Sequence, residues 1–352
     1  MNKKLFISDL SLVLGNNKSE SKVLTNINFD LEESEIGCIL GPSGCGKSSL
    51  LRAIAGFENI NSGSILKDGV CISNSLENTS VQDRKMGMVF QDYALFPNMD
   101  VKTNIAFGLK YNTKKEKENR VNYLLDMVGL GQYKDKYPHE LSGGEQQRIA
   151  LIRALAPSPD ILLLDEPFSN IDADIKEDLV SDVRDLLKEL SITSVIVTHD
   201  QNEAFNIADK VAIMNNGKVE QIGNAYDIYH KPVNKFVADF IGLGVFVPIT
   251  RNKNGQLETP LGMIEKDKLS GNHIESKDLE MLLRPDDIIH NDQSDIMAVV
   301  MEKQFRGAEF LYKLLYNDRY PLLCFAPSHH DHKIGEAIGI ELEIEHYVIF
   351  EK

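Results

Sequence analysis

The sequence predicts an α/β domain built on a mainly parallel sheet, followed by a small all-β, OB-like barrel domain. In residues 1–235, short apolar runs alternate with amphipathic helical patterns, which is typical of strand–helix–strand units. A glycine-rich stretch, GPSGCGKS at 41–48, separates one such run from a helical pattern. In residues 236–352, short strand-like pieces are separated by Asn, Gly, Asp and Pro, which favours an all-β domain.

The expected strands of the first domain fall into two groups. Two early strands are predicted from KLFISDLSLVL and LTNINFDLE, and a few antiparallel strands are expected at the sheet edge. Buried parallel strands read as short continuous apolar runs, and these are EIGCIL, ILLLDEP and TSVIVTHD. KEDLVSDVRDLLKEL lies between the last two and has the spacing of an amphipathic helix.

Composition and charge narrow the function classes. A length of 352 residues suits about two domains, and 42% hydrophobic residues can build a core. The net charge of −15 argues against a nucleic-acid binder, which needs a basic surface. Four cysteines without a CxxC pair indicate reduced thiols. With no signal peptide and no apolar run of roughly 18 residues, we expect a soluble chain.

The stretch at 41–48 matches the GxxxxGK[ST] phosphate loop and has the strand and helix on either side that this motif requires. Glycines let backbone N–H groups approach phosphate, and the helix that follows adds the positive end of its dipole. Lys47 supplies a positive charge, and the Ser48 hydroxyl suits Mg²⁺. The predicted phosphate-binding residues are Gly41, Pro42, Ser43, Gly44, Cys45, Gly46, Lys47, Ser48 and Ser49.

Two further stretches carry candidate chemistry. In ILLLDEP, Asp165 at the end of a buried strand can reach Mg²⁺, and Glu166 can polarise a water molecule. LSGGEQQR at 141–148 offers bare amides at the start of a predicted helix, which makes a second anion site. The alternative for this second stretch is a plain helix cap. Its predicted binding residues are Ser142, Gly143, Gly144 and Glu145.

The order of these motifs resembles the ATP-binding subunits of ABC transporters over residues 1–235. The matching landmarks are the phosphate loop, VFQDYALFP with Gln91, LSGGEQQR, ILLLDEP, SNIDAD with Asp172, and VTHD with His199. The resemblance implies a P-loop ATPase domain with a mixed sheet and a helical subdomain. It also implies a homodimer, because in that family LSGGEQQR binds the γ-phosphate of ATP held by the opposite subunit.

The family's roles carry over to matching residues. Ser48, Gln91 and Asp165 are expected at Mg²⁺, and Gln91 is also expected to sense the γ-phosphate and face the membrane partner. Glu166 is the expected general base, and His199 is expected to contact the γ-phosphate and orient the attack. Asp172 belongs to the segment at the dimer contact.

One departure concerns the adenine. The family usually places an aromatic ring near the N-terminus to stack on the base, whereas this chain has Leu14 there and no aromatic residue between Phe6 and Phe29. Stacking contributes about 1–3 kcal/mol per base in nucleic-acid sites. We expect Leu14 and Val23 to replace part of it by apolar contact.

The resemblance also implies partners and a location. FPNMDVKTNIAFGL at 96–109 resembles the segment of importer subunits that docks onto an integral membrane permease, and LLRPDDI at 282–288 resembles a landmark of the importers' C-terminal β-domain. That domain is expected to contact its dimer mate or to regulate. These features place the chain at the cytoplasmic face of the inner membrane, linked through the permease to a periplasmic or extracellular solute-binding protein.

Residues 236–262, with the chain length, most resemble ferric-iron importers. Sulfate, polyamine, phosphonate and sugar importers remain alternatives, because the ATP-binding subunit rarely touches the solute. A non-transport ABC ATPase of translation or DNA repair is a remote alternative: the former carries two cassettes and the latter long coiled coils. For SHHDH at 328–332, the short spacing favours a surface loop, with metal sensing as the alternative.

Overall fold

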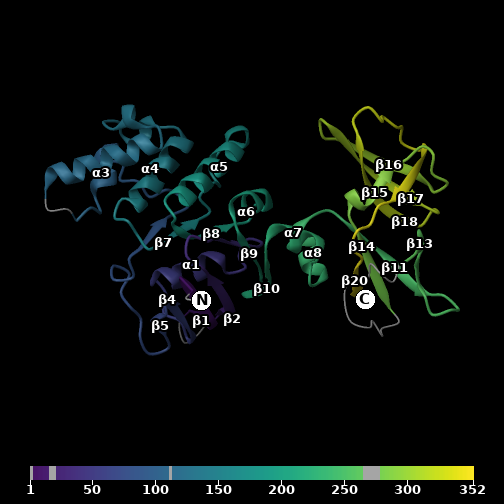
Figure 1. Cartoon of the computed structure of the whole chain (residues 1–352), viewed down its shortest axis with the longest axis horizontal. Helices are drawn as coiled ribbons and strands as arrows, with labels where there is room; N and C mark the ends of the chain where they lie inside the picture. Colours follow the sequence, from purple (N-terminus) through teal and green to yellow (C-terminus); the bar gives the residue numbers. More distant parts are fainter. Residues whose placement is uncertain (1–2, 16–20, 111–112, 265–277) are drawn as a thin grey trace. The chain divides into compact units, whose positions relative to one another are not determined.

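The computed structural model describes residues 3–15, 21–110, 113–264 and 278–352 (Figure 1). The chain divides into two compact units, Met1–Ala225 and Tyr226–Lys352. The division predicted after residue 235 falls at the start of helix α8 (Lys235–Ile241), inside the second unit.

A six-stranded sheet forms the centre of the first unit, in the order β10-β9-β3-β8-β7-β6. Every neighbouring pair is parallel except β9 and β10, which form an antiparallel hairpin at one edge. The three continuous apolar runs form the three central strands β3, β7 and β8, as predicted. The bounds are β3 (Ile36–Leu40), β6 (Met86–Val89), β7 (Ile161–Asp165), β8 (Thr193–Thr198), β9 (Lys210–Asn215) and β10 (Lys218–Gly223).

The two early strands belong to a second sheet, which the sequence did not indicate. This sheet is antiparallel in the order β2-β1-β4-β5, so β1 and β2 are not edge strands of the parallel sheet. The pairing of β1 with β4 decides this, and it runs from Leu5 opposite Lys67 to Ser11 opposite Ser62, so it joins segments far apart in the chain. The bounds are β1 (Leu5–Leu14), β2 (Ser21–Leu31), β4 (Ser62–Lys67) and β5 (Val70–Asn74).

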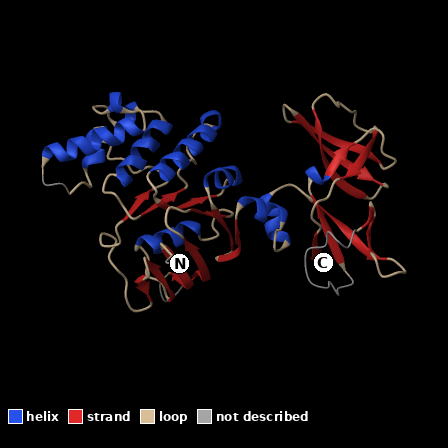
Figure 2. Ribbon diagram, viewed as in Figure 1, coloured by secondary structure: helices blue, strands red, loops and turns tan. Residues whose placement is uncertain are grey.

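Helices cover both faces of the six-stranded sheet (Figure 2). Successive side chains of β7 point to opposite faces: Ile161 and Leu163 pack with α1 and the antiparallel sheet, whereas Leu162 and Leu164 pack with α3, α4 and α5. The helices are α1 (Lys47–Ala55), α2 (Val101–Ala106), α3 (Lys114–Met127), α4 (Gly143–Leu155), α5 (Ala173–Glu189) and α6 (Gln201–Ile207), with 3₁₀ turns η1 (Gly131–Tyr133) and η2 (Pro138–Glu140).

The boundary between the units falls at the first residue of α7 (Ala225–His230). After α7, the described residues of the second unit form α8, strands and the 3₁₀ turn η4 (Pro285–Asp287). Its closed barrel has the order β15-β18-β17-β16-β19, which confirms the predicted barrel. A five-stranded sheet, β13-β12-β11-β14-β20, adds to it. The bounds are β11 (Val245–Arg251), β12 (Leu257–Thr259), β13 (Gly262–Met263), β14 (Leu279–Leu283), β15 (Ile288–His290), β16 (Met297–Phe305), β17 (Glu309–Tyr316), β18 (Tyr320–Pro327), β19 (Ala337–Leu342) and β20 (Val348–Glu351).

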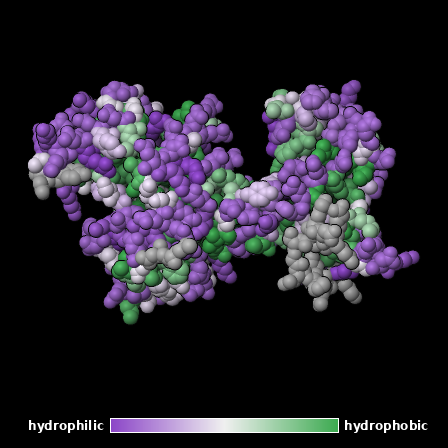
Figure 3. Space-filling view, viewed as in Figure 1, coloured by the Kyte–Doolittle hydropathy of each residue, from purple (hydrophilic) through white to green (hydrophobic). Residues whose placement is uncertain are grey.

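Polar and charged residues cover most of the visible face of the first unit (Figure 3). Among the residues that the structure describes, none of the helices combines the length and the apolar character needed to span a bilayer.

Candidate functional site

The register of the parallel strands brings the predicted catalytic motifs to one edge of the sheet. Leu40 at the end of β3 lies opposite Thr198 at the end of β8, and Asp165 at the end of β7 lies opposite Val197. The segments that follow these strand ends are the phosphate loop, Glu166 and His199. Ligands of open α/β sheets bind outside the carboxyl ends of the strands, so this edge is the candidate active site.

The phosphate loop is packed too closely for side chains at two of its glycines. A Cβ on Gly41 would lie 2.2 Å from the backbone oxygen of Met214. Gly46, directly before α1, has φ of 106°, and a Cβ there would lie 2.9 Å from Leu24. The Lys47 ammonium donates to the carbonyls of Gly41 and Pro42, at 2.8 and 3.0 Å. The loop is therefore a preformed ring of backbone that the lysine holds together.

A pocket of about 210 Å³ opens beside this loop. Six of the nine predicted phosphate-loop residues line it, together with Val23 and Glu166. The six are Ser43, Gly44, Gly46, Lys47, Ser48 and Ser49. The start of α1 and one lysine on the wall make the pocket suited to an anion.

A hydroxyl and a carboxylate meet at the inner end of the phosphate loop. Ser48 Oγ donates a hydrogen bond of 2.8 Å to Asp165 Oδ1. Burial raises the pKa of Asp165 above its ordinary value, and the Ser48 hydrogen bond opposes that shift. Two hard oxygen ligands on adjoining elements fit Mg²⁺, which binds proteins through one or two carboxylates and completes its shell with water and phosphate oxygens. The residues present therefore fit the expected ion.

Glu166 and His199 form a pair at the pocket. Glu166 Oε2 lies 3.2 Å from His199 Nδ1. Glu166 is mostly buried, with 17% of its side chain exposed, whereas half of the His199 side chain is exposed. The Glu166 backbone has φ of 44°, and its N–H donates to Val197 O at 2.9 Å. A carboxylate on the pocket wall, oriented by an imidazole, can take a proton from water.

The structure keeps Gln91 outside the set of pocket-lining residues. Gln91 follows β6 and is exposed, and its carbonyl accepts a 3.1 Å hydrogen bond from Asn170 Nδ2. Asp172 is the N-cap residue of α5 and is also exposed, with no side-chain cap hydrogen bond. Leu14 is half-buried at the end of β1, opposite Ser21, and is not among the pocket-lining residues either.

The LSGGEQQR stretch forms the start of α4 and stands apart from the pocket. Ser142 and Glu145 form a capping box: Ser142 N donates to Glu145 Oε2 at 2.8 Å, and Glu145 N donates to Ser142 Oγ at 3.4 Å. The first of these hydrogen bonds lowers the pKa of Glu145. None of this stretch lines the phosphate pocket within the described parts of the chain. Ser142 is exposed and Gly143 and Gly144 are half-buried, so the helix start faces outward.

Sequence reasoning missed two residues that join these elements. Arg153 of α4 donates to the carbonyls of Tyr93 and Ala94, at 2.8 and 2.6 Å. Asn170 makes the contact to Gln91 described above. The two acceptor residues of Arg153 have positive φ, of 59° and 44°. The sequence gives no signal for this contact. The carbonyls of Tyr93 and Ala94 face Arg153 only because both residues have positive φ.

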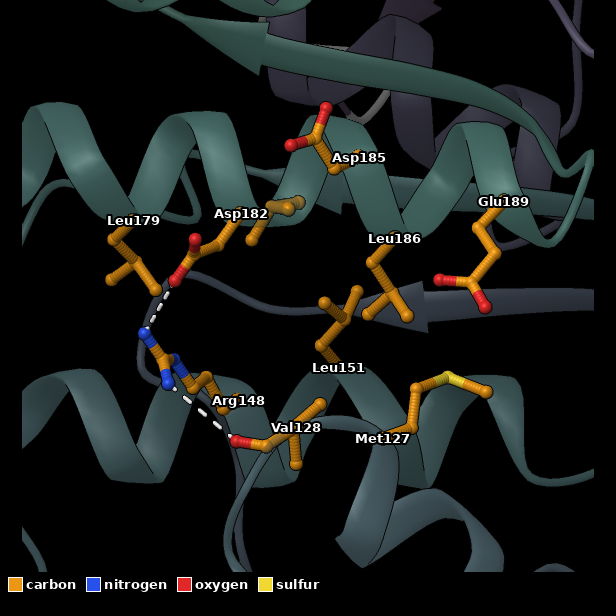
Figure 4. A pocket seen from close by; sticks show the side chains of 10 residues that line it. Met127, Val128, Arg148, Leu151, Leu179, Asp182, Asp185, Leu186 and Glu189 are labelled. Atoms are coloured by element: carbon orange, nitrogen blue, oxygen red, sulfur yellow. Dashed lines mark hydrogen bonds and ion pairs between the residues drawn. The ribbon is translucent and has the colours of Figure 1, made fainter.

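A larger pocket, of about 370 Å³, lies between α4 and α5 (Figure 4). Leu151, Leu179 and Leu186 form part of its wall. Arg148 closes one end, because its guanidinium contacts Asp182 Oδ2 at 2.6 Å and Val128 O at 3.5 Å. No predicted catalytic or phosphate-binding residue lines this pocket, so it is separate from the candidate active site.

Comparison with known proteins places the chain in a family. Residues 24–169 match the model for "ABC transporter", and residues 281–350 match that for "TOBE domain". A sulfate/thiosulfate import ATP-binding protein of Chromobacterium violaceum is 41% identical over 291 residues, which cover 81% of this chain and 78% of that protein. The chain therefore belongs to the ABC transporter family of ATP-binding proteins and carries a C-terminal TOBE domain.

Other relatives differ in the solute that their names give. A sulfate/thiosulfate import ATP-binding protein of Acinetobacter baylyi is 49% identical over 62% of this chain, and the match spans 63% of that relative's own length. An Fe(3+) ions import ATP-binding protein of Rhizobium meliloti is 46% identical over 66% of this chain and 58% of its own length. The dimeric post-hydrolysis structure of the ATP-binding cassette MJ0796, bound to ADP and Pi, superposes with a TM-score of 0.56, 29% identity and coverage of 62% of this chain and 98% of that one.

We predict that Leu14→Tyr tightens ATP binding by about tenfold, since stacking on a base contributes about 1–3 kcal/mol. Leu14 packs against the same core as Val23, which lines the pocket, so a ring at position 14 is expected beside the adenine. Fluorescence titration with a labelled ATP analogue measures the change. Leu14→Met is the control, because it keeps the apolar contact without a ring. An unchanged or weaker affinity for Leu14→Tyr would show that position 14 does not lie at the base.

Proposed function

We propose that the chain is the ATP-hydrolysing subunit of an ABC importer. The observation that carries the proposal is the pairing of Glu166, which lines the pocket beside the phosphate loop, with His199 at 3.2 Å. A regulator that binds nucleotide without hydrolysing it would not need a general base that is positioned and oriented at the pocket. Here the carboxylate, its imidazole partner and the Ser48–Asp165 pair all lie at one sheet edge.

The mechanism follows from what each group offers. Backbone amides of the loop and the Lys47 ammonium bind the β- and γ-phosphates, with the Lys47 side chain already fixed by two carbonyls. Ser48 and Asp165 would hold Mg²⁺, which would supply positive charge beside the phosphates. Glu166 accepts a proton from the attacking water, and His199 orients the Glu166 carboxylate and contacts the γ-phosphate. These roles are our assignments.

The active form is proposed to be a homodimer with two shared sites. The start of α4 is exposed and does not line the chain's own phosphate pocket, which supports a role toward ATP held by another subunit. The similar MJ0796 cassette is a dimer in its structure with ADP and Pi, which supports this arrangement. Each chain would give its phosphate loop to one site and its Ser142–Glu145 helix start to the other.

Docking onto an integral membrane permease is proposed for residues 96–109. Within this segment, Phe107 at the end of α2 is 62% exposed, and its ring lies 4.5 Å from that of Phe96. Asn104 is fully buried and binds the carbonyls of Phe96, Met99 and Asp100, so the segment is a fixed shape. With this docking, the proposed location is the cytoplasmic face of the inner membrane, where the permease would couple the subunit to a solute-binding protein.

For the transported solute we propose ferric iron, supported by residues 236–262 and by the iron relative of Rhizobium meliloti. Sulfate or thiosulfate is the second candidate, because the relatives of Acinetobacter baylyi and Chromobacterium violaceum carry that name. The hydrolysis machinery described above is the same for either solute.

A gene deletion separates the two solutes. We expect a strain without this chain to lose uptake of radiolabelled ferric iron while sulfate uptake stays at the parental level. Re-expression of the wild-type chain should restore uptake, and re-expression of Glu166→Gln should not. If only sulfate uptake were lost, the transported solute would be sulfate or thiosulfate and not ferric iron. Normal uptake of both would contradict both solutes.

We expect Glu166→Gln to bind ATP normally and to lower the hydrolysis rate by about a hundredfold or more, the range for removal of a general base. Glutamine keeps the shape of the side chain but cannot accept the proton, so ATP-bound dimers should accumulate. Phosphate release and size-exclusion chromatography with ATP measure the two effects. Glu177→Gln, on the exposed side of α5, is the control. If Glu166→Gln hydrolysed ATP at the wild-type rate, Glu166 would not be the general base.

The shared-site arrangement predicts that Ser142→Arg binds ATP but hardly hydrolyses it, because the long side chain fills the space beside the Gly143 and Gly144 amides. Ser142→Ala is the control: it loses the cap, at a cost of about 1 kcal/mol, and leaves the space open.

Mixing Ser142→Arg with Lys47→Ala subunits should then restore roughly a quarter of the wild-type rate, because half of randomly paired dimers are mixed and each has one intact composite site. Phosphate release is measured for each variant and for the mixture, with dimerisation followed in the same samples. If a single chain hydrolysed ATP alone, Ser142→Arg would remain active and mixing would add nothing.

A further inference from the structure

Three histidines converge on the closed barrel of the second unit. His290 ends β15, and His330 and His332 lie in the connection from β18 to β19. One ring nitrogen from each lies within 4.8 Å of those of the other two. His290 Nε2 and His332 Nε2 are 3.0 Å apart, and the ring centroids of His330 and His290 are separated by 4.6 Å.

We propose that His290, His330 and His332 form a binding site for a divalent transition-metal ion, with Zn²⁺ as the reference ion. Imidazole is a favoured ligand of zinc, copper, nickel and iron. Two imidazole nitrogens on a tetrahedral zinc, each at about 2.0–2.1 Å, lie about 3.3 Å apart. The Nε2–Nε2 separation of 3.0 Å is close to that value, so little movement is needed to receive the ion.

The backbone that carries two of the histidines is fixed from inside the barrel. Tyr312 of β17 is fully buried, and its hydroxyl donates to His330 O at 2.6 Å and accepts from His332 N at 3.0 Å. A single tyrosine therefore holds the residues on both sides of Asp331. This arrangement presents the two rings toward His290 without any contribution from an ion, as expected of a preformed site.

Carboxylates support two of the three rings. Glu336 Oε1 lies 3.2 Å from His332 Nδ1, which directs Nε2 of that ring toward the cluster. Hydrogen bonds from the Lys333 backbone and from His332 hold the pKa of Glu336 below its ordinary value, so it is ionised. Asp292 Oδ1 lies 3.1 Å from His290 Nε2, and the Asp292 side chain is 66% exposed, so a carboxylate lies between this ring and solvent.

Burial favours the neutral, metal-binding form of the innermost ring. Only 3% of the His290 side chain is exposed. A competing explanation for the short Nε2–Nε2 distance is a hydrogen bond from one ring to the other. That explanation predicts no dependence on metal.

Titration of the full-length chain with Zn²⁺ in the absence of nucleotide tests the site. Isothermal titration calorimetry should show one ion per chain with a low-micromolar or tighter Kd, and Co²⁺ should give the visible absorption of a tetrahedral complex. His330→Ala is the main variant, because no hydrogen bond of the His330 ring is found among the described residues, so the fold should survive. It should weaken Zn²⁺ binding at least about tenfold.

Two further variants make the result specific. His329→Ala is the matched control, since this neighbouring histidine is exposed and outside the cluster, and it should bind as the wild type does. Glu336→Gln should weaken binding about tenfold, because it removes the carboxylate that orients His332. Circular dichroism confirms that each variant is folded. Absence of saturable binding, or equal weakening by His329→Ala and His330→Ala, would overturn the proposal.

Discussion

The first unit depends on the alignment of three parallel strands at their carboxyl ends. β3, β8 and β7 are neighbours in the sheet, and their ends match to within one residue: Leu40 pairs with Thr198, and Asp165 pairs with Val197. Because of that register, the phosphate loop after β3, Glu166 after β7 and His199 after β8 share one edge. A one-residue slip would turn the side chains of β7 to the opposite face. Ile161 and Leu163 would then leave the core that they share with α1, so packing fixes the site geometry.

The alignment also explains the unusual backbone of Glu166. A non-glycine residue with φ of 44° is in a sparsely populated conformation that costs of order 1–3 kcal/mol. Contacts on three sides oppose this cost: the N–H to Val197, the carbonyl that accepts from Ser169 Oγ at 3.0 Å, and the side chain beside His199. The strained turn bends the chain directly after Asp165. Asp165 therefore contacts Ser48 while the next side chain enters the pocket.

The sequence predicts features that depend on neighbouring residues better than features that depend on contacts between segments far apart in the chain. The central strands and the phosphate loop are local features: continuous apolar runs mark β3, β7 and β8, and the glycines mark the turn. Partners far apart in the chain were not predictable in this way. Pairing of β1 with β4 creates a separate sheet, and the sheet of β11, β12, β13, β14 and β20 was not expected.

The candidate sites show the same limit. The motifs named Lys47, Ser48, Asp165, Glu166 and His199, and the strand register explains why they converge. Gln91 and Leu14 lie outside the pocket-lining set. The position of Gln91 depends on the loop after β6, and that of Leu14 depends on the pairing of β1 with β2. In the barrel, the SHHDH stretch contains two of the three clustered histidines, His330 and His332. The third, His290, lies 42 residues before His332, and a single histidine at that distance does not indicate a cluster.

Two contacts of the first unit link the candidate active site to the proposed docking segment. Arg153 ties α4 to the carbonyls of Tyr93 and Ala94, and Asn170 ties the segment after Glu166 to the carbonyl of Gln91. The chain between Gln91 and residue 96 is therefore held by both the helix that begins at Ser142 and the loop that leaves the catalytic strand. Residue 96 is also where the proposed permease-docking segment begins. These hydrogen bonds therefore join the start of the proposed docking segment to α4 and to the loop after Glu166 through specific contacts, in addition to packing in the core.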